Sequence, residues 1–171
     1  MVAVRYCCPM PPSDVRPPSL VGYPSYLAAQ VAKSASRLLS EELAAFGVRP
    51  HHFAVLAALA DFGAQCQQDL CDRLDLDKSH MVGFIDDLEG LGHVARTPDP
   101  ADRRRHRVAI TPAGSALLDQ LFEVERTCQQ TLFGMLDADD HRQLIDLLTT
   151  VVAAADARRL GDADRLQGAS A

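Results

Sequence analysis

The sequence predicts a mainly α-helical protein with one small β-hairpin. Apolar residues recur at spacings of three and four over most of residues 24–160, the pattern of amphipathic helices. Aromatic residues make up only 5% of the chain, which suits Ala- and Leu-rich helices better than a β-sandwich. Residues 93–111 differ, because two short strand-like runs flank a Pro- and Arg-rich tip there, as in a hairpin.

Four helices are expected before this hairpin and two after it. Proline is tolerated in the first turn of a helix, and glycine commonly follows the last turn. These signals place helices at residues 24–47, 50–63 and 78–91, and a short third helix between the last two contains Leu70 and Leu74. Asp77 can cap the fourth helix. After the hairpin, Thr111 and Pro112 begin a long helix, and Asp137 with Asp140 resembles a capping arrangement before the last one.

The chain is expected to form one folded domain between two tails. Residues 1–22 contain five of the ten prolines and few apolar residues at helical spacing, so we expect a flexible N-terminal tail. Residues 161–171 are expected to be a flexible C-terminal tail. The sequence has no run of 18 apolar residues and no secretory signal pattern, so we expect a cytoplasmic protein with no membrane contact.

Positive charge is concentrated in the hairpin. The formal net charge is −6, which argues against general attraction to nucleic acids. Five of the seventeen Lys and Arg residues nevertheless lie within residues 96–111. Local charge decides phosphate contacts, so this distribution indicates a hairpin that is presented to a polyanion, most commonly DNA.

Residues 66–91 have the pattern of a helix-turn-helix: a short helix, a tight turn and a second helix with a polar start. In such a motif the first residues of the second helix meet base edges in the major groove. Here these residues are Lys78, Ser79 and His80, which can all form hydrogen bonds, and we assign Gly83 to the same surface. An ordinary surface helix is the alternative. The hairpin that follows directly makes a winged helix-turn-helix the more specific interpretation.

The tip of the hairpin, or wing, contains the predicted backbone contacts. Asp102 precedes Arg104 by two residues, so their side chains can lie on one side of an extended segment and shape the tip. Arg103 and Arg105 are then left to reach a phosphate or the minor groove. The predicted DNA-binding residues of the wing are Arg103, Arg104, Arg105 and His106. A solvated run of charges is the alternative.

These features together resemble the MarR family of winged helix-turn-helix transcription regulators over about residues 24–158. The likeness rests on Arg-Pro-His-His-Phe-Ala-Val-Leu at 49–56, Asp-Leu-Cys-Asp-Arg-Leu-Asp-Leu-Asp-Lys-Ser at 69–79 and Leu-Glu-Gly-Leu-Gly-His-Val-Ala-Arg at 88–96. Its most specific part is Asp-Pro-Ala-Asp-Arg-Arg at 99–104 with Ile-Thr-Pro-Ala-Gly at 110–114.

The resemblance implies a domain over residues 23–160 that forms a homodimer. The long helices at 23–47 and 112–160 would interleave between subunits, and residues 51–111 would bind a near-palindromic site on double-stranded DNA. Family members usually repress, and many release DNA when a small, often phenolic, ligand binds. A pocket between the first, second and fifth helices is implied, with Tyr26, Phe46, His52 and Phe53 as candidate wall residues.

The chain also departs from the family pattern. Val82 and Gly83 stand where members usually carry polar or basic residues, which weakens direct base reading. Cys66 stands where a Thr-like helix cap is usual, so the third helix is expected to start less firmly.

Other functions remain open at this point. Regulation by oxidation of Cys66, Cys71 or Cys128 is one, and a helical dimeric binding module without DNA affinity is another. An enzyme is not expected, since the sequence has no Gly-rich phosphate loop and no nucleophile elbow. No cofactor is expected. No metal is expected either, because the adjacent His51 and His52 would point about 100° apart on a helix and so rarely share one ion.

Overall fold

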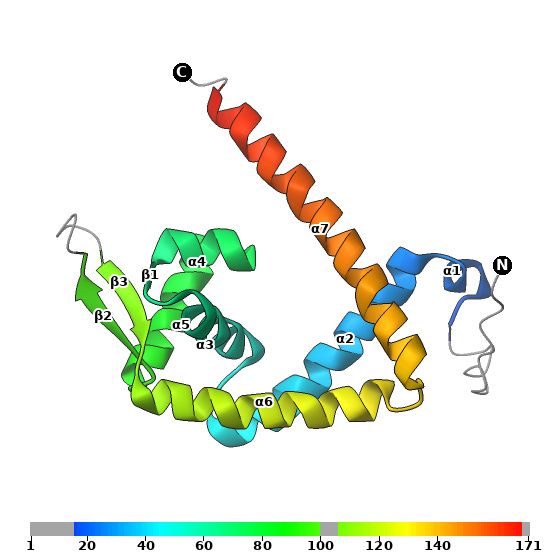
Figure 1. Cartoon of the computed structure of the whole chain (residues 1–171), viewed down its shortest axis with the longest axis horizontal. Coiled ribbons are helices and arrows are strands. Elements are labelled where there is room, and N and C mark those ends of the chain that lie inside the picture. The colour runs from blue at the N-terminus through cyan, green and yellow to red at the C-terminus, as the bar shows by residue number, and fades with distance from the viewer. Residues whose placement is uncertain (1–15, 100–105, 169–171) are drawn as a thin grey trace. The chain divides into compact units, whose positions relative to one another are not determined.

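The structure is a computed structural model that describes residues 16–99 and 106–168. It confirms a mainly α-helical chain in which a small sheet lies beside a cluster of helices (Figure 1). The described residues belong to two compact units, divided at Gln129 and Gln130. The first unit contains the helix-turn-helix and the sheet, and the second consists mainly of the last helix.

The first long helix is α2 (Pro24–Leu43), with the predicted proline in its first turn. One 3-10 turn, η1 (Ala44–Phe46), follows it and ends at Gly47. Gly47 has a φ of 69°, a left-handed conformation that favours glycine. A four-residue helix, α1 (Pro18–Val21), lies within the stretch for which a tail was predicted. Pro18 stands in its first turn, the one helical position where a missing N–H costs nothing.

Three helices enclose the apolar core: α3 (Pro50–Phe62), α4 (Gln67–Leu74) and α5 (Lys78–Gly90). The bounds of α3 and α5 agree closely with the predicted ones. Asp75 has a φ of 51°, and this left-handed residue makes the tight turn between α4 and α5 possible. The fully buried side chains of the three helices are Val55, Leu56, Leu59, Leu70, Met81, Ile85 and Leu88.

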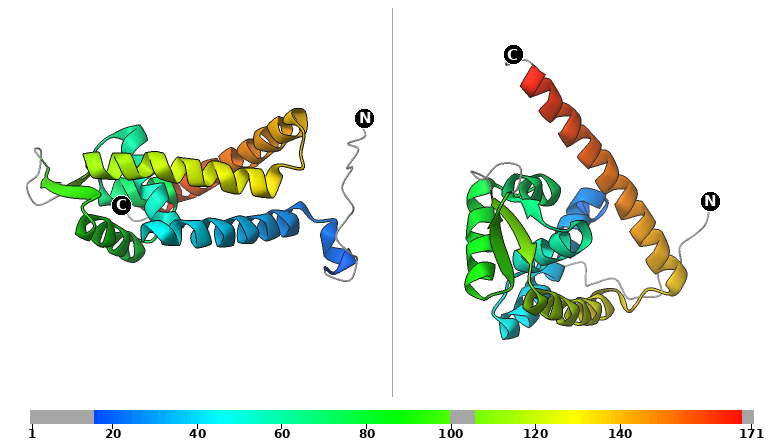
Figure 2. Two further views of the ribbon diagram at one scale, coloured as in Figure 1. Left: turned by 90° about the horizontal axis from the view of Figure 1, so that it is seen from below. Right: turned by 60° about the vertical axis from the view of Figure 1, so that its left-hand side comes forward.

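The predicted hairpin is confirmed as part of a three-stranded antiparallel sheet with the order β1-β3-β2. Strand β2 (Val94–Pro98) pairs with β3 (His106–Ile110) so that Arg96 lies opposite Val108. Strand β2 also lies beside α5, as both views in Figure 2 show. Strand β1 (Gln65–Cys66) was not predicted, because two residues are too short to show any periodicity. It exists through its pairing with β3.

The start of α6 (Pro112–Phe133) is attached to the turn between α5 and β2. Thr111 Oγ1 accepts the N–H of Gly114 at 3.0 Å and donates to the carbonyl of Gly92 at 2.8 Å. The backbone N–H of Thr111 donates to the carbonyl of His93 at 3.0 Å. A Cβ atom on Gly114 would lie only 2.0 Å from that carbonyl oxygen. The predicted cap is therefore confirmed, and the close approach requires a glycine at position 114.

The last helix, α7 (Ala138–Gly168), begins at the predicted cap. Asp137 Oδ1 accepts the backbone N–H groups of Asp139 at 2.9 Å and Asp140 at 2.8 Å. The helix continues past residue 160, where the sequence predicted the start of a tail. Ala163, Arg165 and Leu166 favour a helix beyond that point, and the helix continues to Gly168 although Gly161 and two aspartates have lower helix propensity.

No helix within residues 16–99 and 106–168 is by itself long and apolar enough to cross a membrane. The segments Pro24–Phe46 and Pro50–Phe62 reach the required length and apolar composition only when taken together, and the pair is bent by 79°. The second of these segments contributes Val55, Leu56 and Leu59 to the buried core, which explains its apolar composition.

Candidate nucleic-acid interface

Helix α5 has one buried face and one exposed face. Met81, Ile85 and Leu88 recur at spacings of four and three, and all are 0% exposed. The predicted DNA-contacting residues Lys78, Ser79, His80 and Gly83 are all exposed to solvent, as is Val82. The fold therefore presents these five residues together on the outside of one helix, whose inner face is fixed by the core.

The first turn of α5 is not capped in the predicted way. Asp77 occupies the N-cap position, but its side chain accepts no capping hydrogen bond from the backbone. Its carboxylate instead turns toward His80, with 3.7 Å between Asp77 Oδ2 and His80 Nδ1. The expectation that the Asp77 side chain caps the helix is thus wrong. An uncapped N-terminus leaves backbone N–H groups and the positive end of the helix dipole available to an anion such as a phosphate.

Both hairpin arginines that the structure describes, Arg96 and Arg107, are engaged within the protein. The guanidinium of Arg96 pairs with Asp86 and Glu89 of α5, and its backbone N–H donates to Glu89 Oε1 at 3.0 Å. These hydrogen bonds lower the pKa of Glu89. Arg107 donates to the carbonyl of Ala64. Arg96 therefore joins the base of the wing to the predicted recognition helix, a role that a count of charges along the sequence could not reveal.

The rest of the predicted wing contacts lie at or beyond the ends of the two strands. Asp102, Arg103, Arg104 and Arg105 fall outside the described residues. His106 is exposed and lies opposite Pro98 at the outer end of the sheet. This pair therefore marks the end of the hairpin farthest from α6.

A buried histidine joins α3 to α5. His52 is 2% exposed, and its Nδ1 accepts the backbone N–H of Arg49 at 3.2 Å. Its Nε2 lies 3.3 Å from Asp87 Oδ2, and Asp87 also pairs with the Arg49 guanidinium. Burial lowers the pKa of His52, the Arg49 charge lowers it further, and Asp87 opposes both. This three-residue contact fixes the start of α3 against the second half of α5.

A pocket of about 700 Å³ adjoins this histidine. It is lined by the end of α2, η1 and the loop after it, the first turn of α3 and the second half of α5. Its titratable lining side chains are Arg49, His52, Asp86 and Asp87. Of the four predicted ligand-binding residues, His52 lines this pocket.

The other three predicted ligand-binding residues are placed differently. Phe46 and Phe53 pack against the core, and the Phe53 ring meets the Phe122 ring at 5.3 Å between centroids. Tyr26 lies half-buried on α2. Tyr26, Phe46 and Phe53 are therefore not among the residues that line the pocket beside His52, and their role in ligand binding stays a prediction.

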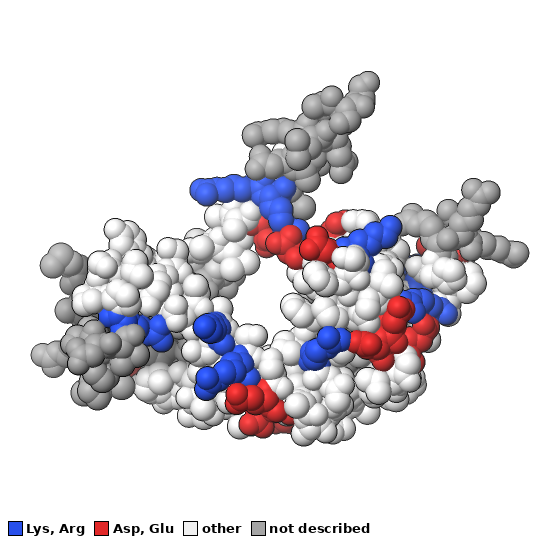
Figure 3. Space-filling model, turned by 180° about the vertical axis from the view of Figure 1, so that it is seen from behind, with Lys and Arg blue, Asp and Glu red and all other residues white. Residues whose placement is uncertain are grey.

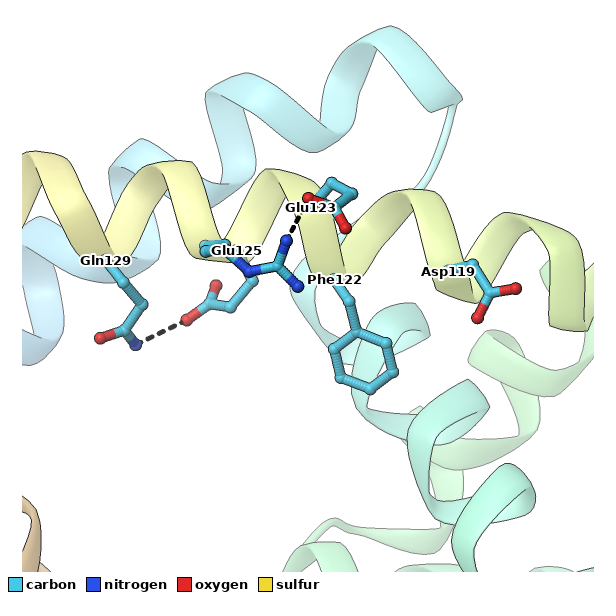
Figure 4. Close-up of a pocket in the computed structure, with 6 residues that line it drawn as sticks. Asp119, Phe122, Glu123, Glu125 and Gln129 are labelled. Atoms are coloured by element: carbon cyan, nitrogen blue, oxygen red, sulfur yellow. Dashed lines mark hydrogen bonds and ion pairs between the residues drawn. The ribbon is translucent and has the colours of Figure 1, made fainter.

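A second pocket, of about 560 Å³, lies along α6 (Figure 4). Phe122 projects from the helix there and is 46% exposed. Glu123 pairs with Arg126, and Gln129 Nε2 donates to Glu125 Oε1 at 2.9 Å. With three carboxylates in its lining against one arginine, this open surface does not attract phosphate.

The face of the molecule shown in Figure 3 has no broad basic area. On the face shown there, most basic side chains lie close to acidic ones. Ion pairs such as Arg126 with Glu123 and Arg142 with Asp139 account for part of this pattern. Several described arginines are thus engaged by carboxylates of the same chain, whereas Lys78 is exposed at the start of α5, where a phosphate contact is expected.

The described cysteines are buried and reduced. Burial raises the pKa of the Cys71 and Cys128 thiols, which lowers their thiolate fraction and hence their reactivity. Cys66 has a structural role: its Sγ accepts the N–H of Asp69 at 3.5 Å, and Asp69 Oδ2 accepts the N–H of Cys66 at 3.2 Å. The thiol thus replaces a hydroxyl in a complete capping box, and the predicted weak start of α4 is not found.

Metal ligands do not cluster in the described part of the chain. Among residues 16–99 and 106–168, no three His, Cys, Asp or Glu side chains are placed to hold a metal ion. His51 instead stacks on Phe84 at 4.9 Å, and His80 stacks on the same ring at 6.5 Å. His51 and His80 therefore pack against the Phe84 ring of α5.

The fold and the exposed face of α5 define a winged helix-turn-helix protein. The MarR family model matches residues 46–105, from the end of η1 to the wing. The regulator YkoM of Bacillus subtilis is 32% identical over 120 residues, which cover 70% of this chain and 78% of YkoM. The chain belongs to the MarR family of transcriptional regulators.

Further relatives agree with this assignment. The transcriptional repressor NicR of Pseudomonas putida is 31% identical over 100 residues, which cover 58% of this chain and 63% of NicR. A mutant MarR of Escherichia coli, complexed with operator DNA, has 28% identity and a TM-score of 0.67 over 74% of this chain and 91% of that one. BpsR of Bordetella bronchiseptica, whose DNA binding is regulated by 6-hydroxynicotinic acid, has 25% identity and a TM-score of 0.70 over 78% and 95%. These relatives are regulators and not enzymes.

Proposed function

We propose that this chain is a transcription regulator that binds double-stranded DNA as a homodimer. Helix α5 enters the major groove, and the β2–β3 wing contacts the backbone or minor groove of a near-palindromic operator. The observation that carries the proposal is the division of α5, whose inner face is fully buried while Lys78, Ser79, His80 and Gly83 are exposed together. A protein that acts on chromosomal DNA is expected in the cytoplasm.

Unpaired apolar side chains support the homodimer. On α7, Ile145, Leu147, Leu148, Val151 and Val152 are between 47% and 67% exposed. On α2, Leu27 and Val31 are 40% and 45% exposed. Contiguous exposed apolar faces of this kind usually mark a protein interface. A dimer would also place two α5 helices on one duplex, which an acidic subunit with few free cations needs for useful affinity.

The function is tested by binding to duplex DNA. The probes are the region upstream of the gene and a library of random-sequence duplexes, with affinity measured by electrophoretic shift. We expect a selected site with two inverted half-sites and an affinity that falls steeply with salt, because phosphate contacts release counterions. Failure to bind any duplex at low salt would favour the alternative, a helical dimeric module without DNA affinity.

The wing arginines are expected to provide much of the phosphate contact. Replacing Arg103 and Arg105 with Ala removes four positive charges per dimer and should lower the slope of log affinity against log salt by about 3.6, at about 0.9 per contact. The dimer should persist, since neither residue lies in α2, α6 or α7. Wild-type affinity in this double variant would contradict the roles assigned to the wing.

A matched control removes the same charge elsewhere. Arg126 and Arg142 are exposed on α6 and α7 and are already paired with Glu123 and Asp139. The Arg126→Ala, Arg142→Ala double variant should keep the wild-type salt slope. A similar loss in both double variants would indicate that net charge alone, and not the wing, governs binding.

We further propose that the protein is a repressor released by a small aromatic ligand. The family relation to the repressor NicR and to BpsR supports this, and so does the pocket beside His52. Tyr26, Phe46 and Phe53 remain candidate contacts for such a ligand. Hydroxylated aromatic acids, 6-hydroxynicotinic acid included, should be tested for release of bound DNA. His52→Gln should weaken any release, and Glu125→Gln in the α6 pocket should not.

Regulation by thiol oxidation is the weaker alternative, because Cys71 and Cys128 are buried and their pKa values are raised. Alkylation of the native protein followed by the same shift assay distinguishes regulation by thiol oxidation from regulation by a bound ligand. Unchanged DNA affinity after alkylation removes the thiol hypothesis. A loss of affinity that Cys66→Ser or Cys71→Ser prevents would support it.

A further inference from the structure

The second turn of α5 presents an apolar and unusually small surface to solvent. Residues three and four apart share one face of a helix, so Ser79, Val82, Gly83 and Asp86 form a single outward stripe. Val82 is 38% exposed and is absent from the core. The stripe thus consists of a hydroxyl, two methyl groups, a bare backbone and a carboxylate.

Neither the space around Gly83 nor its backbone conformation requires a glycine at this position. A Cβ built on it meets no atom within 4 Å, and its φ is not positive, unlike those of Gly47, Gly63 and Gly92. Glycine in a helix interior lowers helix stability relative to alanine. Glycine at position 83 therefore does not stabilise the isolated fold. It does leave the helix surface open to close approach by a partner.

The hydrogen-bonding groups of this face are confined to the ends of the stripe. Lys78, Ser79 and His80 stand in the first turn, and the carboxylate of Asp86, one turn beyond Val82, is held by Arg96 of β2. Between them Val82 offers only methyl groups. A base edge that met Val82 with a donor or acceptor would lose its water without gaining a partner, which is unfavourable.

We propose that Val82 packs against the 5-methyl group of a thymine in each half-site, and that Gly83 lets α5 come close enough for this contact. The inference rests on the proposed DNA-binding function and specifies what the helix reads. Thymine is the only unmodified base that presents an apolar group in the major groove. Val82 is thereby a specificity-determining residue, although it can form no hydrogen bond to a base.

Deoxyuridine tests the contact directly, because it pairs like thymine but lacks the methyl group. The probe is the tightest duplex that wild-type protein selects from the random library, with each thymine replaced in turn. One thymine per half-site should show about a four-fold loss of affinity, and replacement in both half-sites about a fifteen-fold loss, as expected for one and two buried methyl groups.

Val82→Ala should bind the thymine duplex more weakly and should show less than a two-fold penalty for deoxyuridine at that position. The matched control is Leu91→Ala, since Leu91 is exposed at the opposite end of α5. This control should keep the full wild-type penalty.

Gly83→Ala separates close approach from stability. Its thermal midpoint should stay level or rise, because alanine is the better helix former and its Cβ meets nothing. Its DNA affinity should fall at least about ten-fold, since an added methyl group keeps the helix from the base edges. Gly90→Ala, at the end of the same helix and equally unobstructed, should show the first effect without the second.

Three outcomes would overturn the inference while leaving DNA binding intact. These are a wild-type protein insensitive to deoxyuridine at every thymine, a Val82→Ala variant with the full wild-type penalty, or a Gly83→Ala variant with wild-type affinity. Failure to select any duplex would overturn the DNA-binding function itself, and this inference with it.

Discussion

Helices α3 to α5 and helix α7 carry apolar residues at the same spacings but use them differently. In α3 to α5 these residues are buried against one another and against Val94 and Val108 of the sheet. In α7 no side chain among those described is buried, and Val151 is 67% exposed. The first region satisfies its apolar residues within one chain, whereas α7 requires a partner surface. Sequence periodicity detects the helices of both regions but cannot tell burial within one chain from burial against a partner.

The largest effect is expected from charged substitutions on the exposed apolar face of α7. Val151→Glu with Val152→Glu would place four carboxylates in the interface of the proposed dimer, where desolvation of unpaired charge is costly. The dimer dissociation constant should rise at least about 100-fold, and DNA binding should be lost with it. Sedimentation analysis measures the first effect and the shift assay the second.

The control for that experiment changes exposed polar positions on the same helix. Gln143→Glu with Thr149→Glu adds the same charge to α7 without touching its apolar residues. This variant should remain dimeric. A dimer that survives Val151→Glu with Val152→Glu would mean that α7 does not form the interface.

A smaller effect is expected where α6 begins, at its contact with the α5–β2 turn. Gly114→Ala forces a methyl group against the carbonyl of His93, 2.0 Å away, and should lower the free energy of unfolding by about 1–3 kcal/mol. Gly90→Ala meets no atom and should be neutral or slightly stabilising. Denaturant titration at one fixed protein concentration compares them, because dimer stability depends on concentration. Equal stabilities would show that this contact is looser than described.

The smallest effect concerns pH and the buried link between α3 and α5. Burial, with the Arg49 charge, lowers the pKa of His52 below its ordinary 6.5, so the unfolded chain binds a proton more readily than the folded one. The stability contributed by neutral His52 is complete above that value and is lost as the pH falls through the lower pKa of the folded state. The unfolding free energy of wild type should therefore drop more between about pH 7.5 and 5.5 than that of His52→Gln. His51→Gln, on the exposed side of the same turn, should follow wild type.

Much of the fold could be predicted because local signals mark its boundaries. Pro24, Pro50 and Pro112 each stand in the first turn of a helix, and Gly47 and Gly63 follow helix ends with positive φ. The hairpin itself follows from its two strand-like runs and the tip between them, whereas the pairing of Arg96 with Val108 is seen only in the structure. Strand β1 and the extension of α7 to Gly168 could not be predicted in this way. The first depends on pairing with a distant strand, and the second on a helix that continues through Gly161 and Asp162, whose low helix propensity predicts an end.

The candidate interface was predictable in part. The exposed polar start of α5 follows from the helix-turn-helix pattern, since its apolar residues must face the core. The pairing of Arg96 with Asp86 and Glu89 could not be predicted from the sequence, because a chain reversal separates Arg96 from these two residues. Asp77 also looked like a helix cap by position alone, but its carboxylate turns toward His80.

The sequence by itself determined where most of the helices begin and end, which face of each is apolar, and that a basic hairpin follows a helix-turn-helix. These properties depend on neighbours within a few residues, whose spacing can be counted along the chain. Only the tertiary structure decided which charges are free and which are paired, which apolar residues remain exposed, and that Gly83 and Val82 leave a small apolar surface outside the core. Those properties depend on contacts between residues far apart in the chain, which burial and chain reversal create.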